Sequence, residues 1–138
     1  MKKQESGRSM VEMLGVLAII GVLSIGGIAG YMLSMNRFRA NNMIDKAGKF
    51  ATVAFSTKQT SIAMGRPLAD TDITYKTKEL GALDSGEEIK VSSIGADGTV
   101  TLSVTFVNQD VCETALSILG ETTKTCSEGK VALDFKQN

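Results

Sequence analysis

An uncharged apolar run from Met13 to Leu33 dominates the hydrophobicity pattern near the start of the chain. It holds 21 residues and would reach about 31 Å as an α-helix, which matches the hydrocarbon thickness of a bilayer. A cleavable secretory signal has a shorter apolar region, about 7 to 15 residues, followed by a small-residue cleavage site. Only Ala29-Gly30-Tyr31 offers such a site, and it is a poor one. The run therefore predicts a membrane-spanning helix rather than a signal peptide.

Apolar positions continue beyond Leu33 with a helical spacing. They form a stripe with a period close to 3.6 residues, made of Met35, Phe38, Met43, Ile44, Ala47, Phe50, Ala51, Ala54 and Phe55. Gly65-Arg66-Pro67 is a helix-stop signal, so we predict one helix from about Ser9 to Met64. Because amphipathic helices in small domains usually bury their apolar face, we interpret the stripe as the core of a head domain. A partner-binding face is the alternative.

The segment 65–88 is polar and predicts a surface connection. It carries the oxygen donors Asp70, Asp72, Asp84, Glu87 and Glu88. Carboxylates suit calcium, but the glycine and the terminal glutamate of a calcium loop are not at the required offsets. We therefore expect a solvated loop and no metal.

From residue 89 the hydrophobic period changes from that of a helix to that of a strand. Ile89, Val91 and Ser93 alternate with polar residues, and Gly95-Ala96-Asp97-Gly98 is a turn signal. A clean alternation follows on the other side of the turn, at Val100, Leu102, Val104 and Phe106. A last alternating segment contains Val131, Leu133 and Phe135. These patterns predict an antiparallel hairpin and a third strand, and hence an α+β head.

A short helix is predicted between the second and third strands. Asp110 and Glu113 have the spacing of a capping box, and Gly120 supplies a stop. The apolar face of this helix would consist of Val111, Ala115, Leu116 and Leu119.

Two cysteines, Cys112 and Cys126, flank most of this helix and the loop after it. Thiols in a chain that crosses a membrane encounter an oxidising compartment, and a closed loop of about 15 residues would contribute roughly 3 kcal/mol in the chain-entropy model. Free thiols or a redox pair are the alternatives, but there is no CxxC spacing and no His to complete a zinc site. We expect a structural disulfide.

Composition limits the classes of function. The 138 residues include 15 Lys and Arg, 15 Asp and Glu, and neither His nor Trp. Without residues 1–7 the side chains sum to about −1, and no basic patch favours nucleic acid. The chain offers no nucleophile with an adjacent base and no cofactor loop, so we expect neither an enzyme nor a bound cofactor.

One carboxylate, Glu12, precedes the apolar run directly. An ionised group costs about 2.5 to 3.5 kcal/mol at mid-membrane on insertion scales and less near the interface, so such a group usually has a partner. The leader before Gly7 is short and cationic and would stay cytoplasmic. A cut after Gly7 would free an ammonium at Arg8, one helical turn from Glu12 or within reach of the Glu12 of a neighbouring chain.

These residues resemble a prepilin of the type IV pilus and type II secretion pseudopilin superfamily. In that family a short basic leader ends in Gly, a dedicated membrane peptidase cuts there, and the fifth mature residue is Glu. Gly7, Arg8 and Glu12 stand in these relations. The resemblance covers residues 1–35 and implies cleavage between Gly7 and Arg8, N-methylation at Arg8, and a role for Glu12 in assembly. It also implies a pilin fold whose long helix packs on a small sheet, with an exposed disulfide-bounded loop between Cys112 and Cys126.

Two residues depart from the family pattern. The first mature residue is usually Phe, Met or Leu, whereas here it is Arg8, which weakens the inference of methylation. Type IVa pilins often carry a proline where this chain has Ala29. The anchor is closest to that of type IVb pilins, although a leader of seven residues is short for that branch.

Glycines within the apolar run favour contacts between helices. Each costs about 0.8 to 1.0 kcal/mol relative to alanine inside a helix. Gly26 and Gly30 form a small-xxx-small step, which lets helices approach closely in an apolar medium. The simpler interpretation is that glycine is common in membrane helices.

The sequence predicts three parts: a leader at 1–7, a transmembrane or fibre-core segment at 8–33, and a head at 34–138. By resemblance, the chain is a structural subunit of a type IV pilus-like filament, and its partners are other copies, the prepilin peptidase and the assembly machinery. It would reside in the bacterial inner membrane and then in an extracellular or periplasmic filament. The alternatives are a minor pilin or pseudopilin and, in another class, a single-span membrane protein with a periplasmic binding domain.

Overall fold

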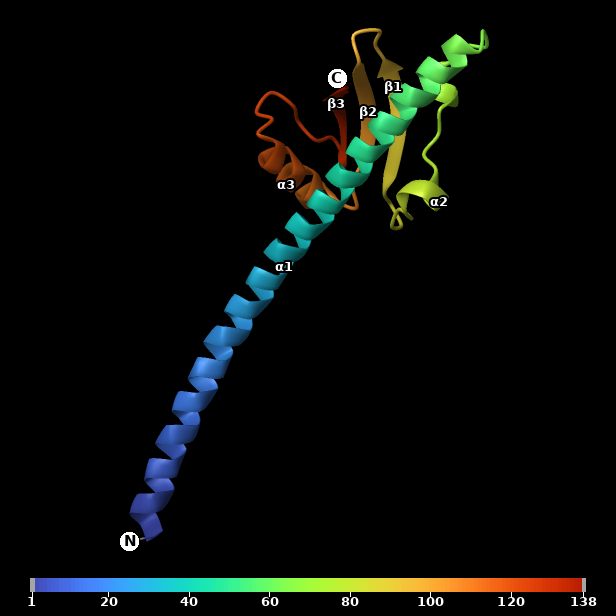
Figure 1. Cartoon of the computed structure of the whole chain (residues 1–138). Helices are drawn as coiled ribbons and strands as arrows, with labels where there is room; N and C mark the ends of the chain where they lie inside the picture. The colour runs from blue at the N-terminus through green and yellow to red at the C-terminus, as the bar shows by residue number, and fades with distance from the viewer. Residues whose placement is uncertain (1, 138) are drawn as a thin grey trace. The chain divides into compact units, whose positions relative to one another are not determined.

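The computed structural model describes the backbone of residues 2–137 and the side chains of residues 9–137. The elements are α1 (Lys2–Ala63), η1 (Asp70–Asp72), α2 (Thr77–Leu80), β1 (Glu88–Ile94), β2 (Thr99–Thr105), α3 (Gln109–Leu119) and β3 (Lys130–Lys136) (Figure 1). The fold class is α+β, as the sequence predicted. The chain divides into two compact units, Met1–Met35 and Asn36–Asn138, and each is described here by itself.

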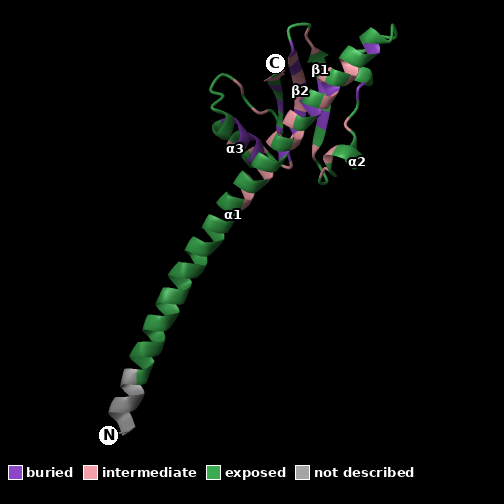
Figure 2. Ribbon diagram, viewed as in Figure 1, coloured by how far each residue is buried: buried purple, intermediate pink, exposed green. Residues whose placement is uncertain are grey.

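The first unit consists of the N-terminal part of α1. Every side chain from Ser9 to Ser34 is exposed (Figure 2). The predicted end of the helix near Met64 is right, since α1 ends at Ala63, but its start is earlier than predicted, at Lys2 rather than about Ser9. The leader consists largely of residues with good helix propensity, and no proline separates it from the apolar run.

The second unit is a head whose core lies between α1 and a three-stranded sheet. The buried face of α1 carries small residues next to two large ones: Ala40, Met43, Ala47, Phe50, Ala51 and Ala54, all fully buried. The alanines let the helix backbone approach the sheet, and Phe50 and Met43 fill the space between them. The prediction that this stripe forms the core of the head is therefore confirmed from Met43 onward.

Phe38 is an exception to that prediction. Its side chain is 63% exposed, whereas the helical spacing predicts a place in the buried stripe. Two residues on an α-helix are about 200° apart around the axis. Since Ala40 faces the core, Phe38 points to the opposite side of the helix.

The sheet is antiparallel throughout, with strand order β1-β2-β3. The central strand β2 buries Val100, Leu102 and Val104 and presents threonines and a serine on its other face. The predicted turn joins β1 to β2, and Gly98 (φ +93°) is required there, because a Cβ would lie 2.4 Å from the Gln137 carbonyl oxygen.

The alternation predicted for β1 fails at its end. Ile89 and Val91 are buried as expected, but Ser93 is exposed. The pairing with β2 shifts between Val91 and Ser93, which is a β-bulge, and Ile94 rather than Ser93 comes to lie on the core side, opposite Val100.

Helix α3 is present but is capped differently from the prediction. The N-cap is Asn108, whose Oδ1 accepts a hydrogen bond from Val111 N at 2.9 Å, and not Asp110 in a capping box. Glu113 instead accepts a hydrogen bond from Gln109 Nε2 at 3.1 Å. The helix ends at Gly120 as predicted, in the left-handed conformation (φ 71°).

The buried face of α3 also differs by one residue. Leu119, expected in the core, is 38% exposed, whereas Cys112 is fully buried beside Val111, Ala115 and Leu116. The predicted disulfide is confirmed: Cys112 and Cys126 are bonded. Gln109 adds to this closure, because its Nε2 donates to Cys126 O at 3.0 Å and its Oε1 accepts from Gly129 N at 2.8 Å.

The connection 65–88 is more ordered than the plain surface loop that we predicted. It contains η1 and α2, buries Ile73, and forms a single β-bridge from Thr74 to Lys90. Two contacts hold this connection against α1. Lys46 Nζ donates to Ala82 O at 2.7 Å, and the Tyr75 ring meets Phe50 edge-on, with centroids 5.3 Å apart.

Asp70 joins three elements of the head. One carboxylate oxygen forms an ion pair with Lys58 of α1 at 2.9 Å, and the other accepts a hydrogen bond from Ile94 N at the end of β1, at 3.1 Å. Lys58 also donates to the Leu68 carbonyl. The hydrogen bond from Lys58, followed by that from Ile94, holds the pKa of Asp70 below its ordinary value of 3.8.

Asp70→Asn should lower the free energy of unfolding by about 1 to 2 kcal/mol near neutral pH, because a charge-assisted interaction is lost while Ile94 N keeps an acceptor. A depressed carboxylate pKa contributes stability above the unfolded-state pKa, and that contribution disappears as pH falls through the folded-state value. The difference between wild type and variant should therefore shrink below about pH 4. Denaturation of the full chain in detergent, followed by circular dichroism at several pH values, measures it.

The matched control is Asp72→Asn, which makes the same chemical change on an exposed residue of the same short helix. It should leave both the stability and its pH dependence unchanged. A pH-independent difference between wild type and Asp70→Asn would contradict the assignment to the carboxylate charge.

Candidate functional site

The most extensive exposed apolar surface of the described chain lies on α1 before the head. All large apolar side chains from Met10 to Leu33 are more than half exposed, from 52% at Ile20 to 74% at Ile25. Burying side chains of this size stabilises by about 1.5 to 3 kcal/mol each, so the whole surface represents on the order of 20 kcal/mol or more. A small domain is stable by only about 5 to 15 kcal/mol. This surface therefore requires an apolar environment outside the chain.

A membrane would provide that environment. In the described part of the chain, α1 is the one helix long and apolar enough to cross a bilayer, and its most apolar stretch is not buried in the structure. That the chain crosses a membrane is supported by length and composition alone.

Glu12 is the one charged side chain between Ser9 and Asn36. It is exposed on α1 at the start of the apolar surface. The other polar side chain well inside the run, Ser24, is satisfied within the helix, because its hydroxyl donates to Ile20 O at 2.7 Å. Glu12 is thus the group in this segment that gains most from a partner on another molecule.

The predicted processing site lies at the edge of the described residues. The backbone of Gly7 and Arg8 belongs to α1, but the Arg8 side chain lies outside the described residues. Glu12 is four positions after Arg8, which is about one helical turn. The cleavage between Gly7 and Arg8 and the methylation at Arg8 remain predictions from the sequence.

The glycines of the apolar segment leave open space on the helix. A Cβ placed on Gly15, Gly21, Gly26, Gly27 or Gly30 would meet nothing within 4 Å. No close approach inside the described chain therefore explains these residues. Gly26 and Gly30 lie four residues apart on one side of α1, where a second helix could approach closely.

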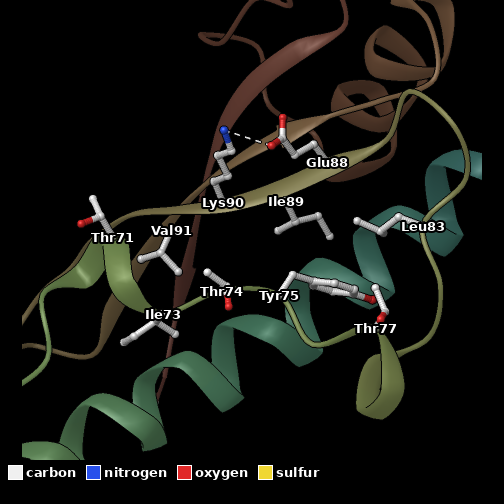
Figure 3. A pocket seen from close by; sticks show the side chains of 10 residues that line it. All are labelled: Thr71, Ile73, Thr74, Tyr75, Thr77, Leu83, Glu88, Ile89, Lys90 and Val91. Carbon is white, nitrogen blue, oxygen red and sulfur yellow. Dashed lines mark ion pairs between the residues drawn. The ribbon is translucent and has the colours of Figure 1, made fainter.

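The head contains a groove that the sequence did not predict. It has a volume of about 370 Å³ and runs between the outer edge of β1 and the connection 71–83 (Figure 3). It is lined by Thr71, Ile73, Thr74, Tyr75, Thr77, Leu83, Glu88, Ile89, Lys90 and Val91. The apolar residues of the otherwise polar connection, Ile73, Tyr75 and Leu83, were the signal that could have revealed it.

Half of the residues that line the groove are apolar or aromatic: Ile73, Tyr75, Leu83, Ile89 and Val91. Ile89 and Val91 lie on its side of β1, while Glu88 and Lys90 point away and pair with each other at 3.0 Å (Figure 3). Burial raises the pKa of Tyr75, with nearby Glu87 adding to the shift, so the phenol stays neutral. Burial also raises the pKa of Glu87. Among residues 9–137, no group of three thiol, carboxylate or imidazole side chains is placed to hold a metal ion.

Comparison with known proteins adds no relative: no family model, no curated protein and no solved structure matches the chain.

Replacing Gly26 or Gly30 by leucine should stabilise the isolated helix but weaken its association with other helices. Gly26→Leu and Gly30→Leu should each strengthen the single helix by about 0.8 to 1.0 kcal/mol through propensity. The same changes should weaken helix-helix association in bilayers, because leucine side chains keep the backbones apart. Chemical cross-linking of the full chain in vesicles, with membrane insertion measured in parallel, tests both.

Gly15→Leu is the matched control, since it lies in the same segment with the same open surroundings but outside the Gly26–Gly30 step. It should leave cross-linking unchanged. Undiminished cross-linking in the Gly26→Leu and Gly30→Leu variants would mean that these glycines are only residues common in membrane helices.

Proposed function

We propose that the protein is a structural subunit of a type IV pilus-like filament, held in the inner membrane by α1, cleaved between Gly7 and Arg8, and polymerised through its apolar helix. The observation that carries the proposal is the apolar surface of α1 from Met10 to Leu33, which is exposed on all sides in a helix that continues into a folded head. Lipid covers this surface first and neighbouring subunits cover it afterwards.

The glycine content argues for the second of these states. Gly26 and Gly30 cost the helix about 0.8 to 1.0 kcal/mol each relative to alanine. Contact with lipid alone does not return that free energy, because lipid chains adapt to any helix surface. Close packing against other helices does, since it adds van der Waals contacts that only small residues permit.

Glu12 supplies the register between subunits. After cleavage the amino terminus of Arg8 is a cation, and in an adjacent subunit shifted along the fibre it can meet the Glu12 carboxylate. At about 4 Å and an effective dielectric constant of 20, such a pair attracts by about 4 kcal/mol. A carboxylate left unpaired among apolar helices is penalised, so misaligned arrangements are disfavoured.

The head is the part that a filament would display. The disulfide and the Gln109 hydrogen bonds hold the loop between α3 and β3 closed, while most of residues 119–128 remain exposed. A covalently closed surface loop withstands the oxidising exterior of the cell. The same features suit a minor pilin or a type II secretion pseudopilin, which would use the same processing and the same helix.

The groove beside β1 favours a second candidate function. A single-span membrane protein with a binding domain outside the cytoplasm would use α1 only as an anchor and the apolar groove as its ligand site. In that case residues 1–7 would stay attached, because anchoring needs no processing.

Mass spectrometry and mutagenesis together test the filament. The mature protein should lack Met1–Gly7, with or without a methyl group at Arg8, and Glu12→Ala should insert normally into membranes because the change removes a charge. Fibre yield should fall by about tenfold, the change in equilibrium constant produced by about 1.4 kcal/mol per subunit. Electron microscopy of sheared surface material, probed with an antibody to the head, measures the yield.

Glu121→Ala is the control, since it removes an exposed carboxylate from the head instead of the apolar segment. Wild-type fibre yield from Glu12→Ala would remove the assembly role from Glu12. A product that keeps Met1–Gly7 and forms no fibres would favour the single-span binding protein.

A further inference from the structure

Arg37, Phe38 and Arg39 follow the apolar run closely, and none of them belongs to the hydrophobic core of the head. Phe38 is 63% exposed, Arg37 is exposed and Arg39 is half-buried. The other phenylalanines take part in the head core: Phe50 and Phe106 are buried, and Phe55 and Phe135 pack partly buried against it. Within residues 9–137, no carboxylate forms an ion pair with either arginine.

The place of these residues along α1 matches the headgroup layer of a bilayer. Along a helix, Arg37 and Arg39 lie about 6 and 9 Å beyond Leu33, where the apolar run ends. The headgroup region on each side of the hydrocarbon is about 5 to 8 Å thick, so the backbone of Arg37 would lie within it and that of Arg39 just beyond its outer boundary. Arginine side chains near the end of a span extend their guanidinium groups to the phosphates, and tryptophan and tyrosine rings are enriched at the same level. Phe38 has the ring without the polar group, so its ring would face the hydrocarbon while the arginines face phosphate.

We propose that Arg37, Phe38 and Arg39 form an interfacial anchor that binds the headgroups of anionic phospholipids on the exported face of the membrane. This inference rests on the proposed membrane insertion of α1. The anchor fixes the depth of the subunit before assembly, so that the head begins to fold immediately outside the headgroups, at Ala40.

Charge favours lipid phosphate over a second copy of the chain as the occupant. Arginines close to the exported end of a span oppose the positive-inside preference, so two of them at this place need a compensating anion. The next carboxylate along α1, Asp45, already forms an ion pair with Lys49 at 2.9 Å. Anionic headgroups supply the missing charge, and each arginine near the surface should favour them about fivefold.

The absence of tryptophan from the sequence permits a direct measurement of depth. Phe38→Trp in the full chain, reconstituted in vesicles of phosphatidylglycerol and phosphatidylcholine, gives a single emitter. Lipids brominated on the upper part of their acyl chains should quench it more than lipids brominated near the chain ends. Leu23→Trp, in the middle of the run, should show the reverse order, and exposed Ile62→Trp near the end of α1 should not be quenched.

These reference positions separate the anchor from the proposed function. If Leu23→Trp is quenched and Phe38→Trp is not, the interfacial anchor is wrong while membrane insertion stands. If neither is quenched, both the anchor and the membrane-inserted subunit are wrong. A Phe38→Trp emission that shifts to the blue with increasing protein-to-lipid ratio, without quenching by lipid, would identify a second copy as the occupant and overturn the proposal.

The lipid preference has its own test. In the Phe38→Trp background, brominated phosphatidylglycerol should quench more strongly than brominated phosphatidylcholine at the same mole fraction, and high salt should reduce the difference. Arg37→Gln with Arg39→Gln should abolish this preference, whereas Lys78→Gln, an exposed lysine of α2, should preserve it. Equal quenching by the two lipids before any arginine is replaced would overturn the anionic headgroup as the ligand.

Discussion

A change of environment along one helix is the constraint on which the rest of the structure depends. From Met13 to Leu33, α1 is apolar on every side, and from Ala40 onward it is apolar on one face only. A helix that is apolar all round must be covered all round, whereas a one-sided helix needs only one layer against it. The head supplies that single layer, so folding within the chain satisfies the second half of α1 and leaves the first half to other molecules.

The head depends on close approach between α1 and the sheet. Fully buried alanines such as Ala47 and Ala51 have short side chains, which let the helix backbone come close to the sheet. The inward-facing valines and leucine of β2 belong to the same core cluster. Polar ties then hold the connection at the side of β1, where Lys58 reaches Asp70 and Lys46 reaches the Ala82 carbonyl. These ties also shield an edge strand that would otherwise offer its backbone to other chains.

Much of this fold was readable from the sequence because it rests on local patterns. The end of α1, the hairpin around Gly98, the stop of α3 at Gly120 and the third strand all follow from period and turn residues. The predictions from the sequence were wrong where a contact between residues distant in sequence determines which side chains face the core. The bulge that turns Ser93 outward depends on pairing with β2.

The remaining errors have the same kind of cause. Leu119 is exposed as the last residue of α3, and the order within 65–88 comes from contacts of Tyr75 and Asp70 with other elements. The candidate site is different again. Glu12, Gly26 and Gly30 contact no other element of the described chain that would define a role for them, so their proposed roles in contacts between subunits remain predictions from the sequence.

In the proposed filament, selectivity cannot come from hydrophobic burial. Lipid chains are as apolar as leucine, so a subunit that leaves the membrane for the fibre gains little from covering Leu23 or Ile25 a second time. The free-energy difference between membrane and fibre must come from groups that lipid stabilises poorly. These are the Glu12 carboxylate and the helix surface without side chains at Gly26 and Gly30. The proposed interfacial anchor would act in the other direction, because its arginines would lose their phosphate contacts on extraction. A few polar and small residues would thus decide between the membrane and the fibre. The apolar side chains between them would be covered about equally well in both.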